Sequence, residues 1–199
     1  MIRIGVDTGG TFTDLVMLGP GGVSVHKVRS TPDDPSRAIL TGIEEIAGAA
    51  TGADVVHGST VATNAVLERK GARVALVATA GFEDVVRIGR QTRRELYNLM
   101  QPDRLPLVDD ALVFGVHERL AADGSVLEQF DPATIDALAR TLVDADVQAV
   151  AVCFLHAYRN DAHERAVAEV LERAGLTVSA SYRVLREYRE YERWSTTIV

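Results

Sequence analysis

The segment from Ile4 to Leu18 constrains the fold most, because it reads as two short apolar strands joined by a glycine-rich turn. The first strand runs into Asp7, and the turn contains Gly9 and Gly10. Glycine lets a backbone take positive φ and lets a ligand approach where a Cβ would stand in the way. Successive N–H groups of such a turn can bind an anion. The segment therefore predicts a β-hairpin, either as a phosphate-binding loop or as a tight turn whose polar side chains satisfy the backbone.

Strands and helices alternate after this hairpin. Residues 23–28 alternate apolar and polar side chains, which predicts a third strand that continues an antiparallel meander. Asp34 and Pro35 are typical of a helix start. The nearly continuous apolar runs at residues 73–79 and 147–154 indicate strands covered on both faces. The pattern predicts an α/β protein with a mixed sheet.

The second half of the chain carries further local signals. Pro102 and Pro106 break regular structure, which predicts a division into residues 1–100 and residues 101–199. A hairpin is expected between residues 112–116 and residues 126–130, with its turn near Gly124.

Two charged segments follow. Asp161 and Glu164 have the spacing of a capping box at a helix start. Residues 186–193 alternate basic and acidic side chains, which predicts a charge-paired surface segment. Trp194, directly after it, is expected to be exposed.

Composition excludes several classes of partner. The chain has 199 residues, with 21 Lys and Arg against 28 Asp and Glu, so its net charge of -7 argues against nucleic acid and against a basic membrane-binding surface. No apolar run reaches the about 18 residues that a membrane-spanning helix needs. The amino terminus lacks the pattern of a signal peptide. The single cysteine, Cys153, lies in an apolar run and is expected in the core. A cytoplasmic location follows most simply.

Two common phosphate-binding motifs do not account for the glycine turn. No G-x-x-x-x-G-K-[ST] sequence is present, which excludes a P-loop. A dinucleotide fingerprint leads from a strand into a helix, whereas Gly9 and Gly10 are followed by a second strand pattern.

A second candidate site begins at His57, which lies where a short predicted strand meets a helix. Ser59, Thr60 and Asn64 follow it, and the free N–H groups and dipole of a helix start favour an anion there. The alternative is a helix capped by Ser59 or Thr60. The 5 histidines show no metal-ligand spacing.

A third candidate site lies at Arg90 and Gln91, in the densest basic segment of this acidic chain. Arginine offers a bidentate fork to a carboxylate or phosphate. A solvated helix face or a subunit contact is the alternative.

Taken in order, several of these motifs resemble those of the hydantoinase A and oxoprolinase family, in its N-terminal domain. The matching segments are residues 5–14, 57–65, 68–72, 81–82, 88–91, 154–160, 189–193 and 195–197. Trp194 departs from the pattern, since a small hydroxyl residue is more usual before Ser195. Together they extend over essentially the whole chain, and several ordered motifs are more specific than one glycine turn.

The resemblance implies the N-terminal half of a ribonuclease H-like, actin-like ATPase fold, with an antiparallel first meander and helices on both faces of a mixed sheet. It implies that Asp7 holds Mg²⁺ and that Asp7 and Asp14 are catalytic. The residues that it places around the ATP phosphates are Thr8, Gly9, Gly10, Thr11, Phe12 and Thr13. Substrate contacts are expected from His57, Ser59, Thr60, Asn64, Arg90 and Gln91.

The implied activity is ATP-dependent hydrolysis of a cyclic amide, in which Mg-ATP phosphorylates an amide or ketone carbonyl oxygen of a lactam, hydantoin or ketone. A subunit of an acetone or acetophenone carboxylase, a small-molecule kinase of the same superfamily and a non-catalytic docking domain are the alternatives. The resemblance also implies a B-type partner subunit, in a hetero-oligomer, or a fused second half. Because family members continue well beyond Val199, the chain is expected to be part of a longer protein and inactive alone.

Overall fold

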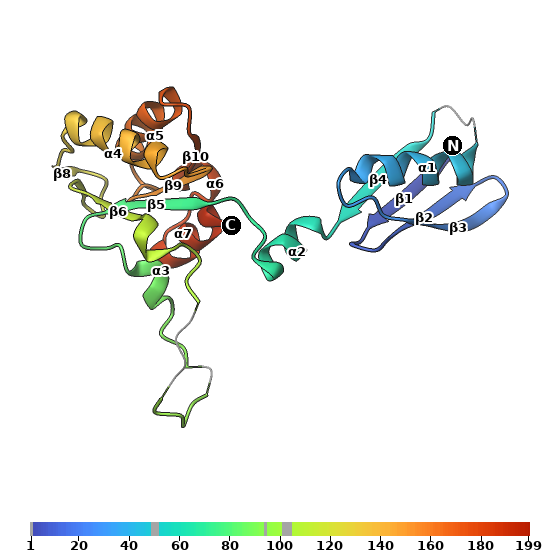
Figure 1. Ribbon diagram of the computed structural model, residues 1–199, viewed down its shortest axis with the longest axis horizontal. Coiled ribbons are helices and arrows are strands. Elements are labelled where there is room, and N and C mark those ends of the chain that lie inside the picture. The colour runs from blue at the N-terminus through green and yellow to red at the C-terminus, as the bar shows by residue number, and fades with distance from the viewer. Residues whose placement is uncertain (1, 49–51, 94, 101–104) are drawn as a thin grey trace. The chain divides into compact units, whose positions relative to one another are not determined.

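The computed structural model describes residues 2–48, 52–93, 95–100 and 105–199, apart from the side chains of residues 61 and 62. These residues form two compact units, Met1–Gly71 and Ala72–Val199 (Figure 1). The boundary predicted near residue 100 falls inside the second unit, because β5 pairs there with strands that follow the proline-containing segment. Pro106 lies outside the helices and strands of the second unit, and Pro102 lies outside the described residues.

The first unit is a four-stranded sheet with the order β3-β2-β1-β4. The meander predicted from the sequence is confirmed, since β1 (Arg3–Thr8), β2 (Phe12–Gly19) and β3 (Gly22–Arg29) pair antiparallel. Strand β4 (Asp54–Ser59) runs parallel to β1. Helix α1 (Pro35–Ala47) connects β3 to β4, and α2 (Val61–Glu68) follows β4.

One face of this sheet carries the core of the first unit. Ile4, Val6 and Leu15 are buried there, and apolar side chains of α1 pack against them. The opposite face is open among the described residues of this unit: Val16 is 45% exposed and Val25 is 71% exposed. Because side chains alternate between faces along a strand, Asp7 lies on the open face.

The second unit has a parallel sheet with the order β10-β9-β5-β6. Its core contains Phe154 and Trp194, both fully buried. Helices lie on both faces of this sheet, with α4 and α5 on one side and α3 and α7 on the other (Figure 1). Its elements are β5 (Val74–Thr79), α3 (Val85–Ile88), η1 (Asp110–Leu112), β6 (Val113–Val116), β7 (Arg119–Leu120), β8 (Val126–Glu128), α4 (Pro132–Asp144), β9 (Ala149–Cys153), α5 (Ala162–Arg173), β10 (Thr177–Ala180), α6 (Ser181–Val184) and α7 (Glu190–Ile198).

The hairpin predicted between residues 112–116 and 126–130 is wrong. Strand β6 pairs parallel with β5, and β8 pairs antiparallel with the short strand β7 instead. The predicted turn is present, since Gly124 has a φ of 90°. The apolar residues of β6 bury against the main sheet, which offers them more contact area than an isolated hairpin.

Two charged residues of the second unit are buried, contrary to expectation. Glu164 does not form a capping box; its carboxylate accepts from Phe154 N at 2.7 Å and Ser181 Oγ at 2.6 Å. Arg193 does not lie on the surface; it donates to the carbonyl oxygens of Phe154 and Glu187. Both side chains satisfy backbone groups where β9 and β10 end, which is why burial is tolerated.

Trp194 and Cys153 complete the interior of this unit. Trp194 is fully buried, so the expectation of an exposed tryptophan is wrong. Cys153 is buried as predicted, and burial raises the pKa of its thiol well above the usual value. None of the helices formed by described residues is long and apolar enough to cross a membrane.

Candidate functional site

Asp7 and Asp14 lie opposite each other at the end of the first hairpin. They are directly paired across β1 and β2 and therefore share the open face of the sheet. Asp14 forms an ion pair with Lys27, with 2.8 Å between Nζ and Oδ1. Asp7 is exposed and has no side-chain partner among the residues that the structure describes. The site thus presents one unengaged carboxylate beside one that is paired.

The glycine turn exposes backbone donors next to this pair. Gly9 N donates to Phe12 O at 3.0 Å, which closes the turn. Within the described part of the chain, the N–H groups of Gly10 and Thr11 donate to no other group. A Cβ at Gly10 would meet nothing within 4 Å, so the space above this backbone is open. The arrangement suits an anion that accepts from successive N–H groups.

The two glycines matter because they lack a side chain, and not because their dihedral angles are unusual. Neither Gly9 nor Gly10 has a positive φ, contrary to the sequence interpretation. A Cβ at Gly9 would lie 3.1 Å from Phe12 O, a contact tighter than most. Gly9 therefore allows the turn to close, and Gly10 leaves its outer surface bare.

The side chains of the threonines that flank the turn form hydrogen bonds with other side chains of the first unit. Thr8 is buried, and its hydroxyl lies 2.9 Å from His57 Nε2. Thr13 is also buried, and its hydroxyl lies 3.0 Å from Ser30 Oγ. The same Ser30 hydroxyl donates to Gly9 O at 2.7 Å. Phosphate contacts predicted for Thr8 and Thr13 would have to come from their backbone, because their side chains are already used.

Ser30 and Lys27 were not predicted from the sequence as residues of this site. Both belong to the β3 region, and they meet the turn only because β3 pairs with β2 in the observed register. The available signal was the length of the third strand, which carries Lys27 to the level of Asp14. Without the register, that proximity cannot be derived from spacing along the chain.

The second predicted segment lies beside the first, because β4 runs parallel to β1. Gly58 is opposite Asp7 and Ser59 is opposite Thr8. Gly58 therefore shares the sheet face of Asp7, and its neighbours His57 and Ser59 lie on the other face of the sheet. Thr60 begins α2 without a capping hydrogen bond from its side chain.

Asn64 lies further along α2, and its N–H donates to Thr60 O at 2.8 Å. The structure thus brings His57, Ser59 and Thr60 to the carboxyl end of β1 and places Asn64 within the following helix.

Arg90 and Gln91 belong to the second unit, just after α3. Arg90 Nε donates to Glu192 Oε1 at 2.8 Å, and this hydrogen bond lowers the pKa of Glu192. The Arg90 guanidinium also lies 6.0 Å from the centre of the Tyr191 ring. Gln91 has a left-handed backbone with a φ of 54°. A polar groove is lined here by Arg90, Thr92, Tyr191, Glu192, Ser195 and Thr196.

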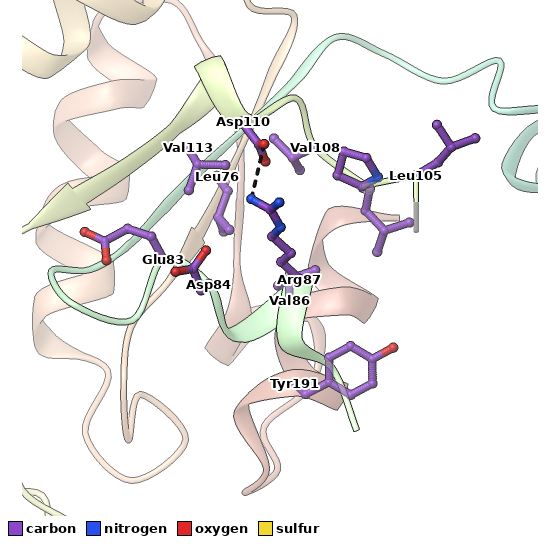
Figure 2. Close-up of a pocket in the computed structure, with 12 residues that line it drawn as sticks. Leu76, Glu83, Asp84, Val86, Arg87, Leu105, Val108, Asp110, Val113 and Tyr191 are labelled. Carbon is purple, nitrogen blue, oxygen red and sulfur yellow. Dashed lines mark hydrogen bonds and ion pairs between the residues drawn. The ribbon is translucent and has the colours of Figure 1, made fainter. Parts of the chain in front are cut away.

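A second cavity, of about 410 Å³, is also lined by Tyr191 (Figure 2). Its walls include Leu76 of β5 and Val86 of α3. Arg87 reaches across it to Asp110, with 3.4 Å between Nη1 and Oδ2. Cavities of this size accept small organic molecules, and apolar walls with a few charged groups fix their orientation.

The first hairpin has donors suited to Mg²⁺ and phosphate. Mg²⁺ commonly takes one or two carboxylates and completes its shell with phosphate oxygens and waters. Asp7 and Asp14 supply such a pair, and Gly10 and Thr11 supply N–H groups beside it. Among the described residues, no group of three or more His, Cys, Asp or Glu side chains is arranged to hold a metal by itself. The residues therefore fit a metal bound together with phosphate.

The chain also matches a protein family and several of its members. Residues 3–175 match the model described as hydantoinase/oxoprolinase N-terminal region. The chain is 38% identical to caprolactamase subunit alpha of Pseudomonas jessenii over 99% of its own length. It is 33% identical to the acetophenone carboxylase gamma subunit of Aromatoleum aromaticum over 98% of its length. It spans 30% of the length of each of these relatives.

Solved structures of this kind have the same fold as the chain. The nucleotide-free structure of acetone carboxylase, an enzyme of ATP-dependent acetone carboxylation, superposes with a TM-score of 0.87 at 28% identity. The ATP-dependent caprolactamase of Pseudomonas jessenii superposes with a TM-score of 0.84 at 34% identity. Each match covers 98% of this chain, and 31% and 30% of the two solved chains. The mixed α/β fold predicted from the sequence is confirmed.

Proposed function

The chain belongs to the hydantoinase/oxoprolinase family, and from that premise we propose that its first hairpin binds the phosphates of ATP in an enzyme that activates a carbonyl group. The observation that carries this proposal is the unengaged carboxylate of Asp7 beside two unengaged N–H groups, at the end of β1. Asp7, Gly10 and Thr11 are all exposed, so a ligand can reach the three groups.

Each residue of the hairpin has a distinct part in this proposal. Asp7 and Asp14 would hold Mg²⁺ from the open face of the sheet. Gly10 and Thr11 would donate their N–H groups to phosphate oxygens, while Thr8 and Thr13 keep the turn in shape. When bound, Mg-ATP would supply the phosphoryl group for an amide or ketone oxygen. Positioning and neutralisation of charge are the protein's main contributions to such transfers.

We further propose that the reaction is hydrolysis of a cyclic amide, such as a lactam or hydantoin. The 38% identity to a caprolactamase subunit supports this class. Carboxylation of a ketone is the second candidate, because the chain superposes on acetone carboxylase with a TM-score of 0.87. Relatives are named as subunits, which supports a hetero-oligomer with a B-type partner.

We also propose substrate contacts for the two groups of residues that were predicted from the sequence. His57, Ser59, Thr60 and Asn64 would contribute from the first unit. Arg90 and Gln91 would contribute from the second unit, where Arg90 lines a groove with three hydroxyl-bearing side chains besides Tyr191.

Isotope transfer tests the reaction directly. The full-length protein with its partner subunit is incubated with Mg-ATP and a lactam labelled with ¹⁸O in its carbonyl group. Activation by phosphorylation predicts that the label appears in inorganic phosphate, because that oxygen leaves with phosphorus. Hydrolysis without label in phosphate would contradict the proposal.

The competing reactions give different products in the same assay. ADP formation that needs both a ketone and bicarbonate would favour carboxylation, and a stable phosphorylated product would favour a kinase. Asp7→Asn is expected to lower turnover on the order of 100-fold. Asp54→Asn is the matched control, since Asp54 begins β4 and pairs with Arg3 away from the turn. A docking domain without catalytic function predicts normal turnover in Asp7→Asn.

A further inference from the structure

Lys27 lies in one row with the two aspartates on the open face of the first sheet. Lys27 of β3 is directly opposite Asp14 of β2, which is directly opposite Asp7 of β1. The Lys27 ammonium lies 2.8 Å from Asp14 Oδ1 and 5.3 Å from the centre of the Phe12 ring. The side chains of Lys27 and Asp14 are 56% and 43% exposed, so solutes can reach both.

The row places one ammonium where a divalent cation would also bind. Two facing carboxylates repel each other, and an ammonium beside one of them reduces that repulsion. Asp7 has no side-chain partner in the described structure, so Lys27 forms an ion pair only with Asp14. A cation that engages both aspartates must compete with Lys27 for the oxygens of Asp14.

We propose that Lys27 is a positioning residue of the nucleotide site, which neutralises Asp14 in the empty site and donates to a phosphate oxygen when a nucleotide binds. This inference rests on the proposed function, because it needs phosphate and metal at the same hairpin. Lysine suits the task, since its ammonium is a compact charge on a flexible stem and binds phosphate as a point charge. The ammonium lies over the Phe12 ring, and this cation–π contact keeps it near the turn.

A purely structural ion pair would behave differently. Exposed pairs of this kind add little to stability, and loss of such a lysine strengthens cation binding through the removed charge alone but leaves nucleotide binding unchanged. Competition predicts two effects of opposite sign: loss of Lys27 strengthens metal binding to the empty site and weakens nucleotide binding without metal.

The pair Arg3–Asp54 is a matched control on the same face of the sheet. Its Nε and Oδ2 atoms are 3.8 Å apart, and the side chains are 68% and 63% exposed. Arg3 is opposite Leu18 rather than a carboxylate, so it is not part of the Asp7–Asp14 row. Arg3→Met removes a cation from the sheet without touching that row.

The experiment measures binding of Mn²⁺ and of ADP to the full-length protein. Free Mn²⁺ is counted by its electron paramagnetic resonance signal without nucleotide, and ADP binding is followed by calorimetry without metal. Lys27→Met is expected to bind Mn²⁺ about two- to five-fold more tightly and ADP several-fold more weakly. Lys27→Arg and Arg3→Met are expected to match the wild type in both assays. Unchanged ADP binding, or unchanged or weaker Mn²⁺ binding, by Lys27→Met would overturn the proposal.

Asp7→Asn separates this inference from the function on which it rests. If Asp7→Asn binds Mn²⁺ and Mg-ADP as the wild type does, the hairpin is not the nucleotide site and both ideas fail. If Asp7→Asn loses binding of Mn²⁺ and of Mg-ADP while Lys27→Met changes neither Mn²⁺ nor ADP binding, only the proposed role of Lys27 is wrong. Because Lys27 is exposed, circular dichroism and the unfolding midpoint are expected to match the wild type in Lys27→Met.

Discussion

Gly9 and Gly10 are adjacent in the first hairpin but contribute differently to it. Gly9 is needed for closure, since a Cβ there would crowd Phe12 O at 3.1 Å. Gly10 has open space where a Cβ would stand, so folding alone does not require glycine there. Stability and binding can therefore be separated by substituting the two glycines in turn.

We predict that Gly10→Ala folds normally and binds nucleotide poorly. Its free energy of unfolding is expected to change by less than about 0.5 kcal/mol, as for most surface substitutions. A methyl group above the unengaged N–H groups would block phosphate and reduce the thermal shift produced by Mg-ADP. Gly9→Ala is expected to lose about 1 kcal/mol of stability through crowding. A wild-type thermal shift in Gly10→Ala would contradict phosphate contact at this position.

Glu164 gives the second unit a dependence on pH. Burial raises the pKa of Glu164 to about 7 from an ordinary value of 4.5, although Ser181 and two backbone N–H groups oppose the shift. The folded state therefore holds this proton more tightly than the unfolded state. Its contribution to stability is fully present below pH 4.5 and is lost as the pH rises to about 7.

The variant Glu164→Gln isolates this contribution. We predict that, between pH 4.5 and 7, the wild type loses about 3 kcal/mol of unfolding free energy relative to the variant. Urea unfolding followed by the fluorescence of Trp194, the single tryptophan, measures both proteins at each pH. Parallel pH profiles would show that Glu164 does not titrate in this range.

At the scale of elements, helix α7 is attached to the second sheet by a buried guanidinium. Arg193 donates from Nε to Ser181 Oγ at 3.0 Å and from Nη2 to Phe154 O at 2.9 Å. It therefore joins α7 to the ends of β9 and β10. Removing it would leave buried acceptors without donors, which is more costly than losing a surface charge.

We predict that Arg193→Met destabilises the second unit by about 3 kcal/mol. Arg186→Met is the matched control, because Arg186 is 57% exposed and pairs with Asp161 at 3.3 Å. It is expected to change stability by less than about 1 kcal/mol. Chemical denaturation compares the two variants, and equal losses would argue against a special role for Arg193.

Elements that are specified by local chemistry could be predicted from the sequence. The helix start at Asp34 and Pro35 is confirmed, with Asp34 Oδ1 accepting from Ser36 N at 3.1 Å. The three-strand meander is confirmed as well. These features depend on local caps or on pairing between strands that follow one another in the chain.

Features that depend on distant contacts were missed. The spacing of Asp161 and Glu164 imitates a capping box, yet Glu164 faces backbone groups at the end of β9. Likewise, Lys27 meets Asp14 only through strand register. Tertiary packing overrides local propensity at such positions, so neither the buried charges nor the full hairpin site follows from the sequence.

On the scale of the whole molecule, the chain corresponds to only part of the relatives that it matches. It spans 30% of caprolactamase subunit alpha and of the acetophenone carboxylase gamma subunit. Its two units supply a hairpin with a carboxylate pair and, separately, a groove at Arg90. Turnover, substrate choice and subunit partners are therefore to be measured on the full-length protein.

Calorimetric titration of the full-length protein with Mg-ADP shows whether the first hairpin holds the nucleotide phosphates. We expect the wild type and Asp54→Asn to bind with the same affinity, and Asp7→Asn to bind on the order of 100-fold more weakly with its fold intact. Wild-type affinity in Asp7→Asn would mean that the nucleotide phosphates are held elsewhere, and the proposed role of the hairpin would be wrong.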